Sequence, residues 1–337
     1  MTKLTKKFVG IDVSKETIDV AVINESNSTE ATFGKFDKTK KGYQSFLKWL
    51  KLKEVEFGKG SVFCMEHTGI YTQSIIEFLA KHDAVIWVEM AYTISRSGGL
   101  QRGKNDKIDA YRIALYAYKN KDNVKEWKQK SKLLIRLKNL MALRSRLLSS
   151  KIALTVPVNE FKSQGFNEEV KAITDLYKNA LAGIEKSIEK VDAELKMLIT
   201  KDKEIRHKYD LLVSVPGIGN VTAMYLLIYT DGFFRLTNAK QLACFCGVVP
   251  FEHSSGSSVR GRSRVHPMAN KKLKHAIHMA ALSSIRYNGE MKTYFERKVA
   301  EGKNKMCVLN AVRNKILHRA VAVIRNDKIY EPLQNVA

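Results

Sequence analysis

Four acidic residues occupy positions from which a folded chain could bring carboxylates together. Asp12 stands in the segment FVGIDVSK (residues 8–15), where its neighbours are strand formers. An unpaired carboxylate in a buried strand is costly, so Asp12 needs a partner. Glu66 ends the segment SVFCME, and Asp106 and Asp109 follow in GKNDKIDA. A spacing of three puts the last two carboxylates on one face of the first turn of a helix.

Clustered carboxylates repel one another and take up protons unless a hard cation lies among them. Mg²⁺ is the usual cation in phosphate chemistry, and two such ions can activate an attacking oxygen and stabilise a leaving one. Taken singly, each acid could be a helix cap or a surface charge, and Asp106 alone would be an N-cap. Together, Asp12, Glu66, Asp106 and Asp109 predict a catalytic Mg²⁺ site.

The elements that must position these acids follow an α/β pattern. Period-two and helical patterns predict strands at 8–13, 17–23, 31–36, 61–66 and 84–89, with helices at 42–51 and 71–82. This order is typical of an RNase H-like (RuvC-like) catalytic domain, which we place at residues 1–130. In such a core the first and fourth strands are neighbours, and a helix after the fifth strand can cross their ends.

The chain becomes helical after about residue 130. Apolar residues from Val170 to Leu198 alternate at spacings of three and four, as in the seam of a coiled coil. The partner is either the segment around Leu133 and Leu147, within one chain, or a second protomer, and both readings stay open. We predict a coiled-coil spacer at 131–208 and a mainly α-helical C-terminal domain at 209–337.

Membrane and secretory classes are not favoured. The uncharged segment 211–230 is long enough to span a bilayer, but Pro216, Gly217, Gly219 and Asn220 interrupt it, which predicts two short helices and a tight turn. The opening MTKLTKKF has no apolar region typical of a signal peptide. The four cysteines show no metal-binding spacing, so we expect reduced thiols and a cytoplasmic protein.

The charge of the chain predicts a nucleic-acid partner. Among 337 residues, 58 Lys and Arg outnumber 34 Asp and Glu, a net charge of +24. Residues 251–328 carry 17 basic against 5 acidic residues, which is half of that net charge. A membrane surface would also attract such a charge, but no amphipathic anchor accompanies it.

Several motifs resemble those of one family. GIDVSK, MEHTG and KNDKIDA are similar to the three acidic motifs of the DEDD transposases of the insertion-sequence-110 family, whose relatives include the Piv-type DNA invertases. VPGIGNVTA and ACFCGVVPFEHSSG resemble the carboxy-terminal transposase domain of that family. The resemblance implies a recombinase that cleaves and exchanges DNA strands at the element ends and the target, guided by a non-coding bridge RNA.

The resemblance also implies a serine nucleophile in the segment HSSGSSVRGR. Alignment to the SG pair of the family puts it at Ser255, with Ser254 as the alternate. A serine attacks phosphate only if a base or metal takes its proton and cations hold the phosphate. Those cations would be Arg260, Arg262 and Arg264, with Lys271 and Lys272 as further contacts to nucleic acid.

Composition alone describes the same segment as a surface loop. Farther on, Pro267 and Ala269 stand where the family usually has a glycine-asparagine turn, which leaves the local turn open. The segment VPGIG resembles the hairpin of a helix-hairpin-helix element, in which Gly217 and Gly219 would expose backbone N–H groups to a DNA phosphate. A plain corner between two core helices is the alternative.

Two other functions fit parts of the sequence. A structure-selective nuclease of the junction-resolvase kind would need the four acids without the serine segment. A non-catalytic binding protein would gain nothing from carboxylates that face phosphates. For the recombinase we expect a homo-oligomer, a dimer or tetramer, in which the long helices hold the serine away from the acids of its own chain, so that the site assembles between protomers.

Overall fold

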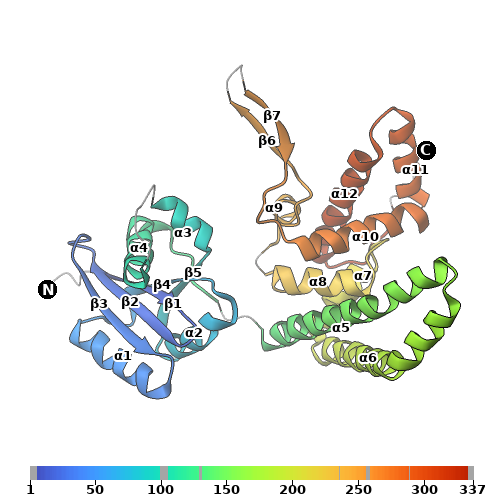
Figure 1. Ribbon diagram of the computed structural model, residues 1–337. Coiled ribbons are helices and arrows are strands. Elements are labelled where there is room, and N and C mark those ends of the chain that lie inside the picture. Colours follow the sequence, from blue (N-terminus) through green and yellow to red (C-terminus); the bar gives the residue numbers. More distant parts are fainter. Residues whose placement is uncertain are drawn as a thin grey trace. The chain divides into compact units, whose positions relative to one another are not determined.

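The structure is a computed structural model that describes residues 6–98, 105–128, 131–234, 236–255, 259–287 and 289–332. The chain forms two compact units, Met1–Gln129 and Lys130–Ala337 (Figure 1). We call them unit 1 and unit 2 and describe each by itself. The division of unit 2 into a spacer and a C-terminal domain stays a prediction.

Unit 1 contains a mixed five-stranded sheet of order β3-β2-β1-β4-β5. The central strand β1 runs antiparallel to β2 and parallel to β4. This topology is compatible with the predicted RNase H-like domain, and it makes the first and fourth strands neighbours as expected. The strands are β1 (Lys7–Val13), β2 (Thr17–Asn24), β3 (Ala31–Asp37), β4 (Gly58–Glu66) and β5 (Ala84–Glu89).

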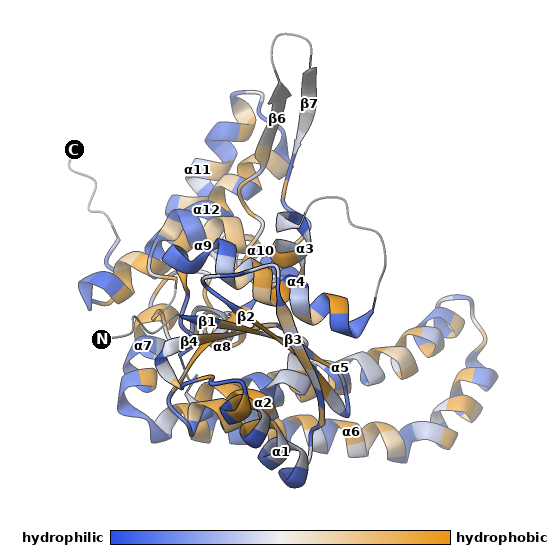
Figure 2. Ribbon diagram, turned by 90° about the vertical axis from the view of Figure 1, so that its left-hand side faces the viewer, coloured by the Kyte–Doolittle hydropathy of each residue, from blue (hydrophilic) through white to orange (hydrophobic). Residues whose placement is uncertain are grey.

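Helices cover both faces of this sheet, so its inner strands are hydrophobic on both sides (Figure 2). Val9 and Ile11 of β1 pack in one core with α1 (Lys40–Leu52) and α2 (Gln73–Ala80). Phe8 faces the opposite core, which holds α4 (Asp106–Lys119). Because side chains alternate along a strand, Asp12 belongs to the face of Phe8 and therefore of α4.

Gly10 allows α4 to lie directly against β1. A Cβ atom at Gly10 would lie 2.1 Å from the carbonyl oxygen of Ala110 and 2.3 Å from the amide nitrogen of Ala114. Both are backbone atoms of α4, so any larger residue would push the helix away from the sheet. The short helix α3 (Ala91–Ser97) precedes α4, and the described part of unit 1 also contains two 3-10 turns, η1 (Gly69–Thr72) and η2 (Lys121–Asn123).

Unit 2 begins with the two longest helices described, α5 (Lys132–Ser163) and α6 (Asn167–Lys201). They form an antiparallel hairpin within one chain (Figure 1). Ion pairs join them at Arg136–Glu194, at Arg144–Asp192 (2.5 Å) and at Lys151–Glu185 (2.6 Å). Of the two predicted partners for the apolar seam, the structure therefore contains the one within the same chain. Coiled-coil supercoiling of the pair stays a prediction.

The base of this hairpin shares a core with the remaining helices. Leu137 and Leu195 lie in the same buried cluster as Leu212, Leu227 and Ile316. The helices are α7 (Lys203–Val213), α8 (Asn220–Thr230), α9 (Ala239–Phe245), α10 (Lys271–Tyr287), α11 (Gly289–Ala300) and α12 (Lys305–Asn326). As predicted, segment 211–230 forms parts of two helices, and no helix in the described ranges is long and apolar enough to cross a membrane. All four cysteines are free.

The Gly/Ser-rich segment differs from the loop that its composition suggests. Both ends of the segment HSSGSSVRGR lie in strands, β6 (Phe251–Ser255) and β7 (Val259–Arg264), which pair antiparallel. Pairing of two strands satisfies backbone hydrogen bonds whatever the side chains are. The amino-acid composition of a segment therefore does not predict such pairing. Residues 266–269 form a turn in which the amide of Ala269 donates to the carbonyl of His266 at 3.0 Å, so Pro267 and Ala269 are accommodated.

Candidate active site

One row of charged residues crosses the sheet of unit 1 near the carboxyl end of β1. Asp12 pairs with Asp19 of β2, and Asp19 pairs with Lys35 of β3. On the other side, Glu66 lies one residue beyond the Ile11–Met65 pair of β1 and β4, and it pairs with Glu89 of β5. Paired residues of neighbouring strands share a face, so all five strands contribute to this row on the side covered by α4.

Helix α4 adds the two remaining predicted carboxylates from above the sheet. The side chain of Asn105 accepts a hydrogen bond from the amide of Lys107 at 2.8 Å and so caps the helix. Asp106 and Asp109 therefore lie in its first turn, as predicted, and the N-cap is Asn105. Arg112 donates to Asp109 at 2.8 Å and holds that carboxylate in place.

Lys35 is a cation at the edge of the row. Its ammonium lies 3.2 Å from a carboxylate oxygen of Asp19 and 3.9 Å from one of Asp106. The hydrogen bond with Asp19 raises the pKa of Lys35 above its usual value. It stays protonated and offsets part of the negative charge.

The electrostatics of the site concentrate on Asp12. Burial, followed by the charges of Asp106, Asp109, Glu66 and Asp19, raises the pKa of Asp12 from 3.8 to about 6. The carboxylates are therefore close enough to repel one another. Such a site gains free energy from any cation that enters it.

The four predicted acids share this face without forming a closed ligand cluster. Over the described ranges, no three His, Cys, Asp or Glu side chains lie close enough to hold a metal ion as they stand. The side chain of Asp106 is 57% exposed and that of Asp109 is 28% exposed. All the donors are carboxylate oxygens, which suit Mg²⁺, and the side chains would have to turn toward one another to bind it.

The sequence reasoning missed Asp19, Lys35 and Glu89. Asp19 is only 8% exposed, and like Asp12 it stands in an apolar strand segment. Glu89 is equally buried and accepts a hydrogen bond from the Tyr116 hydroxyl at 3.2 Å. An acid inside the second strand was the available signal, but only the register of the strands places it opposite Asp12.

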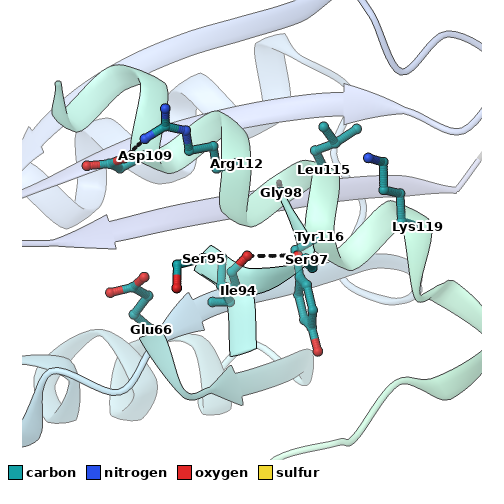
Figure 3. A pocket seen from close by; sticks show the side chains of 10 residues that line it. All are labelled: Glu66, Ile94, Ser95, Ser97, Gly98, Asp109, Arg112, Leu115, Tyr116 and Lys119. Carbon is teal, nitrogen blue, oxygen red and sulfur yellow. Dashed lines mark hydrogen bonds and ion pairs between the residues drawn. The ribbon is translucent and has the colours of Figure 1, made fainter. Parts of the chain in front are cut away.

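A pocket opens beside Glu66 and Asp109, between α3 and α4 (Figure 3). Its volume is about 210 Å³. In Figure 3, Asp109 and Glu66 lie toward one end of the pocket and Lys119 lies toward the other. Arg112 lies on α4, as Asp109 does. The lining residues are Glu66, Ile94, Ser95, Ser97, Gly98, Asp109, Arg112, Leu115, Tyr116 and Lys119.

The predicted nucleophile lies in unit 2, in the β6–β7 hairpin. Ser255 is the last residue of β6 and pairs with Val259, while Ser254 pairs with Arg260. The side chains of Ser254, Ser255, Arg260 and Arg262 lie outside the described part of the structure. The register therefore sets one predicted arginine beside one predicted serine along the backbone.

The two glycines of the predicted helix-hairpin-helix element, Gly217 and Gly219, differ from each other. Gly217 has a positive φ of 93°, and a Cβ atom there would lie 2.5 Å from the carbonyl oxygen of Ala280 in α10. Close packing thus explains Gly217 without a ligand. Gly219 is exposed, caps α8 and has nothing within 4 Å of a Cβ position. Of the two, Gly219 has the backbone that a phosphate could reach.

Exposed cations gather at the start of α10. Lys271 and Lys272 are exposed in its first turn, which contains no acid, and Arg264 is exposed at the end of β7. The N-terminus of a helix carries partial positive charge, so lysines there are unfavourable unless an anion is bound. This end of unit 2 fits a phosphate ligand electrostatically.

Comparisons with known proteins find matches in both units. Residues 9–160 match the model of the DEDD transposases of the IS110 type, and residues 209–296 match the model described as "Transposase IS116/IS110/IS902 family". The pilin gene-inverting proteins of Moraxella bovis and Moraxella lacunata are 28% and 27% identical over 333 residues, 97% of this chain and 98% of each relative.

A 42 kDa protein of the insertion element IS900 of Mycobacterium paratuberculosis is 28% identical over 134 residues, 39% of this chain and 33% of that protein. The two family matches cover the carboxylate region of unit 1 and most of the helical region that carries the β6–β7 hairpin. The chain belongs to the IS110 family of transposases.

Proposed function

We propose that this transposase cleaves and exchanges DNA strands with two sets of groups: the carboxylates of unit 1 and a serine of unit 2. Asp12, Glu66, Asp106 and Asp109 would hold Mg²⁺, which supplies charge neutralisation at the reacting phosphate. The observation that carries this proposal is the row of carboxylates on one face of the sheet, beneath the first turn of α4, where burial and the neighbouring acids raise the pKa of Asp12 to about 6.

The nucleophile would be Ser255, with Ser254 as the alternate. The serine oxygen forms a bond to phosphorus while the bond from phosphorus to a sugar oxygen of DNA breaks; the serine gives up its proton, and the leaving sugar oxygen takes one up. The resulting phosphoserine ester conserves the energy of the phosphodiester. A sugar hydroxyl of another strand can reverse these steps and release the serine, so no external energy source is needed.

The remaining contacts fall on the basic end of unit 2. Arg260, Arg262, Arg264, Lys271 and Lys272 would bind backbone phosphates, which position DNA without reading its sequence. The choice of element ends and target would fall to a bridge RNA through base pairing. We also propose a homo-oligomer, because symmetric assembly allows the acids of one protomer to serve the serine of another.

Denaturing electrophoresis of a cleavage reaction tests the nucleophile. A covalent adduct of protein and DNA should form with the natural chain and disappear in Ser255→Ala. An adduct that persists there but disappears in Ser254→Ala would shift the assignment by one residue. Cleavage with no adduct at any time would contradict the serine mechanism and favour a nuclease of the junction-resolvase kind.

A matched test addresses the acids and the shared site. Asp12→Asn should abolish cleavage while nucleic-acid binding persists, and wild-type rates from this variant would refute the carboxylate assignment. A mixture of Asp12→Asn and Ser255→Ala proteins should recover part of the cleavage if protomers share the site. Failure to recover any would place a complete site within one chain.

A further inference from the structure

The pocket between α3 and α4 continues the candidate active site along one face of α4. Four of its lining residues follow one another along α4 at spacings of three, four and three, which places their Cα atoms in one stripe of the helix: Asp109, Arg112, Tyr116 and Lys119. The pocket therefore begins at the carboxylates and ends at Lys119. Over ten helical residues this corresponds to about 15 Å.

The charges in the pocket change along its length. Glu66 and Asp109 are acidic at one end, while Lys119 is an exposed cation at the other. Between them, Arg112 is occupied by its 2.8 Å bond with Asp109. Ile94 and Leu115 add apolar wall. With a cation held by the acids, as the proposed function requires, both ends of the pocket attract anions, so the pocket fits a ligand with two anionic groups and less polar parts between them.

Lys119 differs from the nearest lysine on the same segment. Lys121 forms an ion pair with Glu25 at 2.7 Å. For Lys119, the described residues offer no comparable salt bridge. The partial negative charge at the end of α4 would favour a lysine at either position, so it does not account for the place of Lys119 at the rim of the pocket.

We propose that this pocket holds the sugar-phosphate backbone of the DNA strand that leads away from the scissile phosphate, with Lys119 as a contact to a phosphate of that strand. The inference rests on the proposed role of the carboxylates, since they define where the scissile phosphate lies. Neighbouring phosphates of one strand lie about 7 Å apart, because the strand winds around the helix axis while it rises about 3.4 Å per nucleotide, so 15 Å places this phosphate roughly two nucleotides from the cut. The sugars between would lie against Ile94 and Leu115.

Single methylphosphonates, which remove the charge of one phosphate, test the contact. Substrates carry one such group at each of the six positions on either side of the cut, and binding is measured with Ca²⁺ in place of Mg²⁺, so that the carboxylates are neutralised while cleavage is suppressed. For the natural chain, one position two or three nucleotides from the cut should weaken binding roughly two- to ten-fold. In Lys119→Gln the same methylphosphonate should add no further loss.

Lys121→Gln is the matched control. It removes the same charge only two residues farther along the chain, but from a lysine that already forms an ion pair with Glu25. It should keep the sensitivity of the natural chain at every position. Lys119→Gln should also reduce by about one the slope of log affinity against log salt. Both variants alter partly exposed side chains, and thermal unfolding should confirm that both remain folded.

Three results would overturn the inference: equal effects of the two lysine variants, a methylphosphonate pattern unchanged in Lys119→Gln, or the same pattern on a guide RNA strand and not on DNA. The proposed function fails separately. If Asp12→Asn cleaves at wild-type rates, the carboxylate assignment is wrong. If Asp12→Asn is inactive while Lys119→Gln behaves as Lys121→Gln, only the pocket inference is wrong.

Discussion

Asp12 and Asp19 are cross-strand partners on β1 and β2 and share the sheet face that α4 covers. Asp19 is 8% exposed, and the ammonium of Lys35 lies 3.2 Å from its carboxylate. Two acids are thus paired directly in a sheet, an arrangement that is destabilising without a cation. Asp19 and Lys35 together influence how much negative charge the site presents.

Asp19→Asn should lower the pKa of Asp12 below its value of about 6, because it removes one of the charges that raise it. Titration of the carboxyl carbon of Asp12 by NMR measures this shift. Glu25→Gln, which removes an acid just beyond the opposite end of β2, should leave that pKa in place. An unchanged pKa in Asp19→Asn would show that the two carboxylates do not interact.

The stability of the metal-free protein should fall as pH rises through the titration of Asp12. Its pKa is 3.8 as a reference and about 6 in the folded chain, so between these values the folded state binds more protons than the unfolded state. The free energy of unfolding then decreases with rising pH across this window and stays lower above it.

Asp12→Asn should remove this part of the pH dependence and stabilise the metal-free protein above pH 6. Thermal unfolding at pH 4, 5, 6 and 7 measures the effect. Added Mg²⁺ should stabilise the natural chain more at pH 7 than at pH 5, since protons compete for the same oxygen atoms. Equal stabilisation at both values, or none at either, would argue against Asp12 as a ligand.

Gly10→Ala should destabilise unit 1 by about 3 kcal/mol and reduce cleavage. Its Cβ atom would lie 2.1 Å from a backbone oxygen of α4, which cannot move without displacing Asp106 and Asp109. Gly183→Ala is the control: it lies within α6 with nothing near a Cβ position, and it should be neutral or stabilise by up to about 1 kcal/mol. Denaturant unfolding compares the two, and similar midpoints would contradict the close approach of α4.

Substitutions of the two glycines at the α7–α8 corner should distinguish a packing role from a binding role. Gly217→Ala combines a positive φ with a clash against Ala280, so it should destabilise unit 2 by about 2 kcal/mol. Gly219→Ala has room for its Cβ atom and should cost less, up to about 1 kcal/mol, because alanine is a poorer N-cap than glycine. If the α7–α8 corner contacts a phosphate, Gly219→Ala should weaken DNA binding in a folded protein. Unaltered binding would leave this corner with a packing role alone.

The arginines of the β6–β7 hairpin should determine much of the salt dependence of binding. Each neutralised phosphate releases counterions, so replacement of Arg260, Arg262 and Arg264 by glutamine should lower the slope of log affinity against log salt by about three. Replacement of Lys178, Lys186 and Lys190 of α6 removes the same charge elsewhere in unit 2 and serves as the control. A slope that changes equally in both would assign the effect to net charge.

Much of the local structure could be predicted because it depends on short-range periodicity. Short runs of strand formers specify the strands at 8–13 and 61–66, and the spacing of three between Asp106 and Asp109 puts both in one helical turn. The interruption by Pro216 and Gly217 likewise separates α7 from α8. These features need only the propensities of neighbouring residues.

The sequence by itself therefore determined the family motifs, the strand order typical of an RNase H-like core and the four candidate carboxylates. Only the tertiary structure decided that Asp19, Lys35 and Glu89 join their row, that Gly10 admits α4, and that a pocket follows Asp109 toward Lys119. Strand register and helix approach depend on contacts between residues far apart in the chain. A local pattern does not encode them, because many registers satisfy the same alternation until the whole core packs.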